Sequence, residues 1–238
     1  MNKFIFDVDG TLTPSRQIIN SEFANWFHDF AKHNAVYLVT GSDRQKTLEQ
    51  LGYPIYNSAI RVYNCSGNDV WEQNDNIYTS DFKISDALRN DLEQILNNSK
   101  FYAKTGNHIE ERPGLCNFSI VGRNCSLEER FYYVEWAECE NERELIAEYL
   151  REKYPNILFG IAGQTGIDIT LKGFDKSQIL KDFDIKNDNI YFFGDKMQPG
   201  GNDYELSLAI ARSGHIIHQV KNWNDTWEKL KKQSGDLE

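Results

Sequence analysis

The chain has 238 residues, and its 26 Lys and Arg against 36 Asp and Glu give a net charge of −10. At about 150 residues per domain, this length predicts one large domain or two small ones, with a core that needs no disulfide staples. The acidic balance argues against binding to nucleic acid or to an anionic membrane, because both need a basic surface. A small anionic ligand is compatible with it, because a pocket can be positive in a protein that is negative overall.

The cysteines and the N-terminus indicate the compartment. The four cysteines are scattered and form no C-x-x-C pair, which argues against a disulfide framework and a structural zinc site. We expect reduced, mostly buried thiols. Asp7 and Asp9 interrupt the apolar N-terminus, so no signal peptide is expected, and no apolar stretch reaches the ~18 residues of a membrane span. These features predict a cytoplasmic protein.

The first third of the chain alternates between apolar runs and an amphipathic helix. Residues Lys3–Val8 and Ala35–Thr40 are almost continuously apolar, which is typical of strands buried on both faces. Between them, helical spacing gives one apolar face, formed by Phe23, Trp26, Phe27 and Phe30. A short helix is expected to run to Leu51. A strand, a helix and a strand within about 30 residues predict a crossover unit and therefore a parallel sheet.

The pattern then changes to that of an α+β domain. Residues 55–80 are polar and turn-rich, with a hairpin turn predicted at Ser66–Asp69, and a helix is expected from Ser85. A capping box, Ser126 with Glu129, predicts the start of a helix that runs to about Lys153. Strands are expected at Asn107–Arg112, Leu115–Gly122, Leu158–Ala162 and Ile167–Leu171.

From Ser177 the alternation of helix and buried strand returns. Helices are expected at 177–183 and 202–212, strands at 190–193 and 216–220, and a last helix carries Trp223 and Trp227. The predicted fold class is therefore α/β: a doubly wound, mainly parallel-sheet (Rossmann-like) core of residues 1–81 and 174–238, interrupted by an inserted α+β domain of residues 82–173.

The most specific local pattern is Asp7-Val8-Asp9-Gly10-Thr11, directly after the first strand. Open α/β sheets bind ligands at the carboxyl ends of their strands, and two acids that converge there need a cation or a shared proton. The alternative is that Asp7 and Asp9 merely cap a loop. The pattern resembles the opening motif of the haloacid dehalogenase superfamily of phosphotransferases.

Further polar residues follow the later strands in the order expected for that superfamily. Ser42 ends the second strand, Lys176 begins a helix, and Asp195 ends the strand at 190–193, with Asn202 and Asp203 close behind. Singly these residues are weak signals, because Ser is also an ordinary helix N-cap and a lone Lys is usually solvated. Hard oxygen ligands without His or Cys favour Mg²⁺.

The charges of these residues suggest a different catalytic role for each. Asp7 is expected to attack phosphorus and form an aspartyl-phosphate, while Asp9 gives a proton to the leaving oxygen and later takes one back. Ser42, Lys176 and Mg²⁺ would stabilise the phosphoryl group as it transfers. The predicted metal ligands are Asp7, Asp9 and Asp195, supported by Asn202 and Asp203.

The inserted domain carries three arginines, Arg112, Arg123 and Arg130. Arg130 falls in the first turn after the Ser126 cap, where the helix dipole disfavours a cation by ~0.3–1 kcal/mol. Its placement makes sense if a phosphate also binds at that helix start. The alternative is a surface ion pair with Glu128 or Glu129.

Several longer strings closely resemble the eukaryotic-type phosphomannomutases, in order and with near-matching spacing. They are FDVDGTLTPSRQ, R-x10-RNCSLEER, GQTGIDI-x4-FDK and IYFFGDKMQPGGND. The resemblance implies that Asp7 is the nucleophile, Asp9 the general acid/base and Asp195 a Mg²⁺ ligand. It also implies sugar-phosphate contacts from Arg16, Arg112, Arg123, Arg130 and Asp168.

Some positions depart from that family, and others belong to neither pattern. The family usually has Ser where this chain has Gly166, and it has an aromatic–Thr–Asp loop for a second cation where this chain runs Leu-Ser-Leu-Ala after Glu205. The spacing Gly160-x-x-Gly163-x-x-Gly166 is not that of a dinucleotide-binding loop and is expected to serve strand and turn geometry. The five histidines, including His215 and His218, are expected to be structural.

The resemblance implies a phosphomannomutase that interconverts mannose 6-phosphate and mannose 1-phosphate, with a hexose 1,6-bisphosphate of mannose or glucose as activator. Such an enzyme supplies GDP-mannose biosynthesis. A Mg²⁺-dependent sugar-phosphate phosphatase and an inactive sugar-phosphate-binding module are the alternatives. The expected partners are small sugar phosphates, with no nucleic acid or membrane, and a homodimer through the inserted domain. The aromatic stretch 131–136 is equally compatible with such a surface and with the core of the insert.

Overall fold

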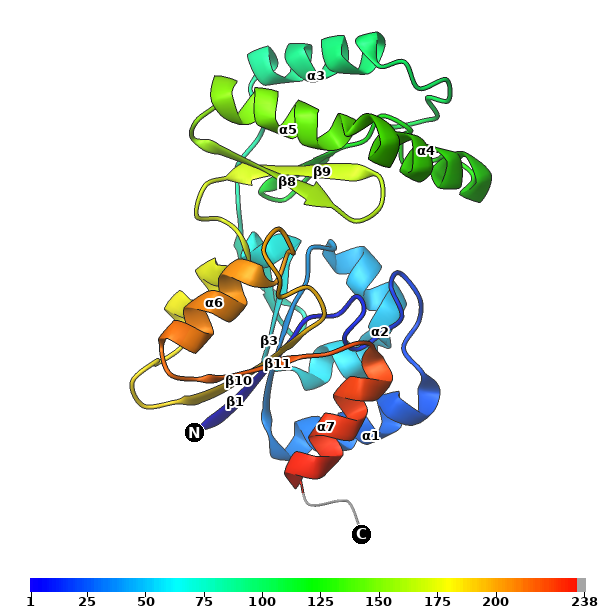
Figure 1. Cartoon of the computed structure of the whole chain (residues 1–238). Coiled ribbons are helices and arrows are strands. Elements are labelled where there is room, and N and C mark those ends of the chain that lie inside the picture. The colour runs from blue at the N-terminus through cyan, green and yellow to red at the C-terminus, as the bar shows by residue number, and fades with distance from the viewer. Residues whose placement is uncertain (235–238) are drawn as a thin grey trace. The chain divides into compact units, whose positions relative to one another are not determined.

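A computed structural model describes residues 1–234 of the chain, and these residues form two compact units. Unit 1 contains Met1–Thr79 and Gly173–Glu238, and unit 2 contains Ser80–Lys172 (Figure 1). Within residues 1–234, no helix is both long and apolar enough to cross a lipid bilayer.

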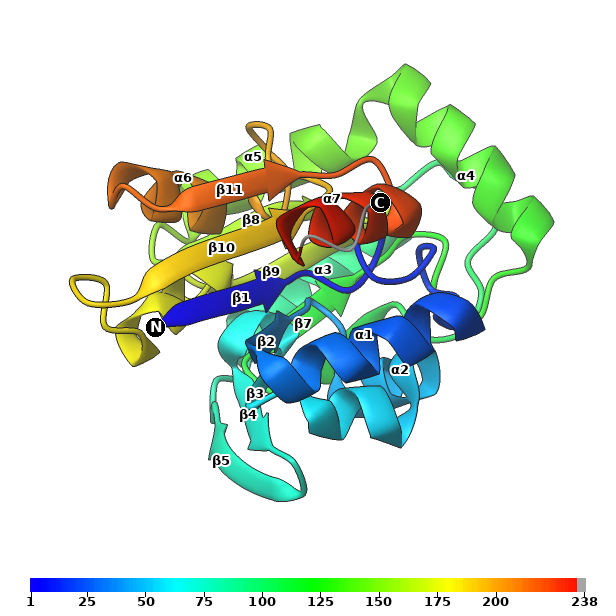
Figure 2. The ribbon, with the colours of Figure 1, turned by 90° about the horizontal axis from the view of Figure 1, so that it is seen from below.

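Unit 1 is built on a seven-stranded sheet in the order β11-β10-β1-β2-β3-β4-β5 (Figure 2). Its strands are β1 (Asn2–Phe6), β2 (Ala35–Val39), β3 (Arg61–Asn64), β4 (Asp69–Glu72), β5 (Asp75–Thr79), β10 (Asn189–Gly194) and β11 (Ile216–Gln219). The strands from β11 to β3 are parallel, and β4 and β5 are antiparallel. The carboxyl ends of β1, β2 and β10 therefore lie at one edge, with Asp7 directly after β1.

Helices cover both faces of this sheet. The helices are α1 (Ser21–His33), α2 (Arg44–Ser58), α6 (Tyr204–Arg212) and α7 (Trp223–Ser234), with the 3₁₀ segments η1 (Cys65–Gly67) and η2 (Lys176–Asp182). One hydrophobic cluster joins the α1 face with Phe6 and Phe193 of the sheet, and Trp223 and Trp227 of α7 pack against it. A second cluster joins Ile179 of η2 and Leu206 of α6 to the opposite face. The doubly wound, mainly parallel core is confirmed.

Unit 2 is a four-stranded antiparallel sheet with helices on one face (Figure 1). The strand order is β6-β7-β9-β8, and the elements are α3 (Asp86–Asn98), β6 (Ile109–Arg112), β7 (Leu115–Phe118), α4 (Leu127–Glu140), α5 (Glu142–Lys153), β8 (Ile157–Ala162) and β9 (Gly166–Leu171). Side chains of all three helices and of the sheet form one separate cluster, centred on Phe118, Tyr133 and Phe159.

Two predicted helices differ from what the sequence pattern suggested. The helix expected from Ser126 to about Lys153 breaks at Asn141, which adopts a left-handed conformation with φ of 53°. The break lets α4 bury Tyr133 and α5 bury Ile146 in the same cluster. The helix expected at 177–183 is a 3₁₀ segment, whose three-residue period places Lys176 and Ile179 on one buried line.

The polar stretch 55–80 contains more regular structure than we predicted. It holds the end of α2 and the strands β3, β4 and β5. The helix predicted to end at Leu51 is interrupted at Gly52, which has φ of 72°, and then continues to Ser58. We did not predict β3 because it contains polar residues. In the structure these residues have partners: Arg61 is paired with Glu72 and Asp182, and Asn64 donates to the Tyr56 hydroxyl.

The cysteines and histidines have ordinary structural surroundings. No disulfide joins the four cysteines in the described chain, of which Cys65 and Cys116 are buried and Cys139 is exposed. Burial raises the pKa of the Cys116 thiol to about 12. His215 Nε2 lies 3.1 Å from the Ile185 carbonyl oxygen, and the His218 ring stacks on Phe193.

Candidate active site

Asp7 is buried at the carboxyl end of β1, in contact with a buried lysine. Its backbone N–H donates to the Phe193 carbonyl at 2.9 Å, and the Thr11 hydroxyl donates to Oδ2 at 3.2 Å. Lys176 Nζ donates to Asp7 Oδ1 at 2.5 Å and to Asp203 Oδ1 at 2.7 Å, and all three side chains are almost fully buried. The solvated lysine considered from the sequence is therefore excluded.

A cluster of three carboxylates surrounds this lysine. Asp7, Asp195 and Asp203 each place an oxygen within 4.8 Å of the others. Asp195 follows β10, and its Oδ1 is buried without a hydrogen-bond partner. An orphaned anionic oxygen beside two further carboxylates is chemically suited to a hard divalent cation such as Mg²⁺.

The pKa values in the cluster reflect crowding of negative charge. Burial, then the Asp203 carboxylate, raise the pKa of Asp7 to about 8, against the opposing effect of Lys176. Burial likewise raises the pKa of Asp195. Burial alone would lower the pKa of Lys176, but Asp203 and Asp7 outweigh it, so the lysine stays protonated. One lysine cannot balance three acids, which again favours a bound cation.

Two glycines let the acids approach. A Cβ on Gly10 would lie 2.4 Å from Asp195 Oδ2, and φ of Gly10 is 84°, in the left-handed region. A Cβ on Gly194 would lie 2.7 Å from Asp203 Oδ2. Side chains at these positions would push the carboxylates apart, so the glycines of the two strand ends are part of the site.

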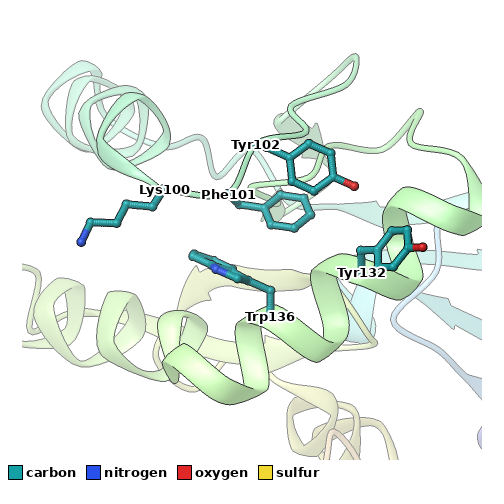
Figure 3. Close-up of a pocket in the computed structure, with 5 residues that line it drawn as sticks. All are labelled: Lys100, Phe101, Tyr102, Tyr132 and Trp136. Carbon is teal, nitrogen blue, oxygen red and sulfur yellow. The ribbon is translucent and has the colours of Figure 1, made fainter.

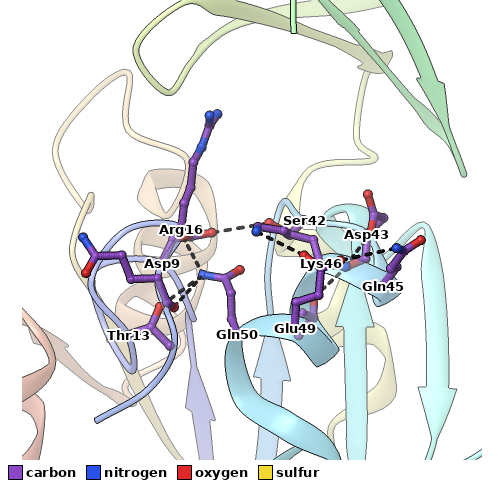
Figure 4. A network of polar contacts seen from close by, with 11 residues as sticks. Asp9, Thr13, Arg16, Ser42, Asp43, Gln45, Lys46, Glu49 and Gln50 are labelled. Carbon is purple, nitrogen blue, oxygen red and sulfur yellow. Dashed lines mark hydrogen bonds and ion pairs between the residues drawn. The ribbon is translucent and has the colours of Figure 1, made fainter. Parts of the chain in front are cut away.

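Asp9 lies in a separate hydrogen-bond network, shown in Figure 4. Its Oδ1 accepts from the Arg16 backbone N–H at 2.6 Å and from Gln50 Nε2 at 3.0 Å, and Ser42 Oγ lies 3.4 Å from Oδ2. The carboxylate of Asp9 is thus not in the three-acid cluster, whereas Asp203, which we predicted only as a support, is.

The sequence did not indicate Gln50, and it left open whether Ser42 was a helix N-cap. Gln50 comes from the buried face of α2, and its amide also donates to the Thr13 hydroxyl at 3.2 Å. The N-cap of α2 is Asp43, which accepts from the Lys46 N–H, so Ser42 is not the cap. Arg16 adopts φ of 61°, and its side chain is exposed and extends away from the network (Figure 4). Asn202 is exposed beside buried Asp203.

Two of the three predicted arginines of unit 2, Arg112 and Arg123, share one glutamate. Glu110 Oε2 lies 2.8 Å from an Nη of Arg112 and 2.6 Å from Arg123 Nε. Burial and the neighbouring Arg112 lower the pKa of Arg123, with a smaller effect of Arg130, and Glu110 opposes them. Arg112 and Arg130 therefore both lie near enough to Arg123 to act on its charge, and positive groups gathered in this way can attract an anion.

Arg130 lies in the first turn of α4, as predicted. The capping box forms: Ser126 Oγ accepts from the Glu129 N–H, and Glu129 accepts from the Ser126 N–H at 2.7 Å. Glu129 also accepts from the Thr105 hydroxyl at 3.0 Å. These bonds occupy the carboxylate of Glu129, one of the two acids that we had considered as surface partners for Arg130.

Asp168 lies on β9 opposite Asn117 of β7, whose amide donates to its Oδ1 at 2.7 Å. Gly166 begins the same strand, and Gly163 forms the turn before it with φ of 53°. The segment after Glu205 is part of α6 and buries Leu206 and Ile210, so it forms helix where the resembling family has a loop.

Comparison with known proteins decides the family. The model of the eukaryotic phosphomannomutase family matches residues 23–234. The chain belongs to this family. The matched segment begins after Asp7 and Asp9, so the assignment of those two residues rests on the geometry above.

Curated phosphomannomutases are similar over nearly the full length. One from Dendrobium officinale is 35% identical over 249 residues, covering 98% of this chain and 96% of the relative. One from Glycine max is 35% identical over 222 residues, covering 90% of this chain and 89% of the relative. A probable phosphomannomutase from Caenorhabditis elegans is 32% identical over 242 residues, covering 96% and 95%.

Solved structures share the fold at low identity. An N-terminally truncated, IMP-bound IMP-nucleotidase from Plasmodium falciparum matches with a TM-score of 0.64 at 15% identity, over 99% of this chain and 68% of that one. A trehalose-6-phosphate phosphatase C-terminal domain from C. albicans matches with a TM-score of 0.62 at 15% identity, over 93% and 80%. These two likenesses show the fold alone, and they agree with the predicted α/β fold class of this phosphomannomutase family member.

Proposed function

We propose that this chain is a phosphomannomutase that interconverts mannose 6-phosphate and mannose 1-phosphate. The observation that carries the proposal is the buried Asp7–Lys176 pair beside Asp195 and Asp203, in a chain of the phosphomannomutase family. A buried carboxylate fixed by a lysine is positioned as a nucleophile, and the surrounding charges stabilise a phosphoryl group as it moves.

The reaction follows from the places of the two aspartates. An Asp7 oxygen attacks phosphorus, so that an O–P bond forms to the carboxylate and the P–O bond to the sugar breaks. Asp9 gives a proton to the leaving sugar oxygen. In the reverse direction Asp9 accepts the proton of the attacking hydroxyl and the phosphoryl group leaves Asp7. A hexose 1,6-bisphosphate acts as activator, because it supplies the phosphoryl group that primes Asp7.

Mg²⁺ is the proposed metal, with Asp7 and Asp195 as carboxylate ligands and Asp203 beside them. When bound, it neutralises negative charge on the phosphoryl group and on the acids. Asp9, which we predicted as a ligand, supplies no carboxylate oxygen to this cluster and keeps the acid/base role in the proposal. Ser42 and Lys176 are proposed to contact phosphoryl oxygens.

We propose that the arginines of unit 2 bind the phosphate that is not transferred. Arginine suits this task because its guanidinium group can hold a phosphate through two parallel hydrogen bonds. Glu110 pairs with both Arg112 and Arg123 and so holds their side chains close together although their charges repel. Arg123→Ala and Arg130→Ala should each raise KM for the hexose phosphate, by roughly the tenfold or more that one charge-assisted bond provides. Unchanged kinetics in both variants would remove them from the site.

The decisive experiment follows mannose 1-phosphate by ³¹P NMR, with and without a catalytic amount of glucose 1,6-bisphosphate. A mutase forms mannose 6-phosphate, and the bisphosphate accelerates it. Release of inorganic phosphate without the isomer would replace the proposal with a sugar phosphatase. Removal of divalent cations with EDTA should stop isomerisation, and Mg²⁺ should restore it.

A homodimer through unit 2 is part of the proposal. Of the aromatic stretch of α4, Tyr133 is buried, whereas Phe131 and Tyr132 remain 58% and 45% exposed. Tyr132 and Trp136 line a shallow pocket with Lys100, Phe101 and Tyr102 (Figure 3). Light scattering should give the mass of two chains, and Phe131→Glu with Tyr132→Glu should give one. A wild-type monomer would refute the dimer.

We place the enzyme in the cytoplasm because no disulfide joins the described cysteines.

A further inference from the structure

The sheet of unit 2 has one apolar and one polar face. Cys116, Phe118, Ile167 and Ile169 contribute to the hydrophobic cluster under the helices. Because side chains alternate along a strand, their neighbours Asn117, Gly166 and Asp168 belong to the opposite face. Across the strands, Asn117 is opposite Asp168, and Asp168 is opposite Gly160. Asn117, Asp168 and Gly160 therefore form a row across three strands, and Gly166 lies two positions before Asp168 on the same face of β9.

Gly166 has no side chain beside this row, and the amide of Asn117 fills the space. A Cβ at Gly166 would lie 2.5 Å from Asn117 Nδ2 and 3.2 Å from its Oδ1. Gly166 does not have a left-handed backbone, so its main-chain conformation does not call for glycine. A side chain there would instead have to displace the amide of Asn117.

From this position Asn117 holds Asp168. Its Nδ2 donates to Asp168 Oδ1 at 2.7 Å, and Asn117 itself is 7% exposed. A buried amide has few alternative partners, so it fixes the plane of the carboxylate that it meets. A larger residue at 166 would displace the amide and remove this hydrogen bond to the carboxylate.

We propose that Asn117 is a positioning residue for substrate selectivity: seated in the space left by Gly166, it fixes Asp168 for contact with the hydroxyls of a hexose phosphate. The inference rests on the proposed function. Mannose and glucose differ in the direction of one hydroxyl, and a carboxylate with a fixed direction separates such epimers better than a mobile one.

Four variants test the inference: Asn117→Ala, Gly166→Ala, the double variant and Gly160→Ala. Gly160 is the matched control, because it lies in the same row and a Cβ there would meet nothing within 4 Å. Two quantities are measured for each protein: kcat and KM for mannose 1-phosphate and glucose 1-phosphate, and calorimetric Kd values for mannose 6-phosphate and glucose 6-phosphate.

Asn117→Ala and Gly166→Ala should each reduce the mannose-to-glucose ratio of kcat/KM and of affinity about tenfold, with kcat changed about twofold or less. The double variant should resemble the single ones, because both act through one contact. Gly160→Ala should match the wild type. The inference is overturned if Gly166→Ala behaves like Gly160→Ala, if the effects multiply, or if the variants lose thermal stability with the ratio unchanged.

Failure of the proposed function gives a different result. A wild type that forms no isomer refutes the mutase, while the affinity ratio still decides the role of Asn117. Conversely, an active wild type whose selectivity survives Asn117→Ala refutes only the positioning role.

Discussion

Each reactive group in unit 1 is defined by its partners rather than by its residue type. Asp7 and Asp9 are two residues apart, yet Asp7 meets Lys176 and Asp9 meets Gln50 and the Arg16 backbone. Asp7 is buried among charges, whereas Asp9 accepts hydrogen bonds at the edge of solvent. The two carboxylates can therefore take different roles in one reaction.

Asp7→Asn tests the nucleophile. The amide has nearly the same shape but cannot attack phosphorus, and it removes one negative charge from a crowded cluster. We expect isomerisation to be lost while the thermal midpoint stays the same or rises. NMR measures the rate of isomerisation, and circular dichroism measures the thermal midpoint. Asp225→Asn is the control, because this acid pairs with Lys229 on α7 and should leave turnover unchanged. An active Asp7→Asn enzyme would refute the covalent mechanism.

Lys176→Met tests the buried ion pairs. Removing the lysine leaves two buried carboxylates without their cation, and loss of one partner from such a group costs about 3–5 kcal/mol. Urea titration in EDTA should show this loss. Lys229→Met breaks a partly exposed pair at the surface and should cost about 0–1 kcal/mol. Equal losses in both variants would show that Lys176 does not compensate the acids.

At the scale of elements, helix starts and strand ends place the functional side chains. The end of β1 carries Asp7, the end of β10 carries Asp195, and the first turn of η2 carries Lys176. In unit 2 the capping box of α4 fixes the turn that bears Arg130. Elements with buried faces are rigid, so the groups at their ends are held in place.

Ser126→Ala tests the start of α4. The substitution removes the hydroxyl that accepts from the Glu129 N–H, and a lost N-cap costs about 0.5–2 kcal/mol. Urea denaturation of the full chain measures it. Glu128→Ala, in the same turn but exposed, should change the unfolding free energy by less than about 0.5 kcal/mol. If the two variants are equally stable, the capping box does not stabilise the helix.

At the scale of the molecule, the two units differ in how their chains are connected. Unit 1 is assembled from two segments separated by 80–172, whereas unit 2 is one continuous segment. Unit 2 also has its own buried cluster, with Leu88, Phe118 and Tyr133 at its centre. A continuous segment with its own core meets the usual requirement for independent folding.

Residues 80–172 expressed alone should therefore fold. We expect cooperative thermal unfolding and dispersed NMR spectra, because the hydrophobic cluster of unit 2 lies wholly within this segment. Residues 1–79 alone should not fold, because β1 pairs with β10 from the second segment. A disordered 80–172 fragment would show that unit 2 depends on unit 1 for its stability.

The sequence by itself determined the doubly wound core, the strand ends that carry Asp7, Ser42 and Asp195, and the cap at Ser126. These follow from local signals: apolar runs, helical spacing and capping residues act over a few positions. The family resemblance extended them to the arginines of unit 2. Prediction from hydrophobic periodicity failed at β3. Its polar residues do not look like those of a buried strand, because they are paired with residues distant in the sequence.

Only the tertiary structure decided which polar groups meet. Asp203 joins Asp7 and Asp195 while the carboxylate of Asp9 does not, Gln50 comes from the buried face of α2, and Asn117 occupies the space above Gly166. These contacts join residues up to 196 positions apart in the sequence, as for Asp7 and Asp203. They depend on strand register and on the absence of a Cβ at chosen glycines, and no local pattern records either.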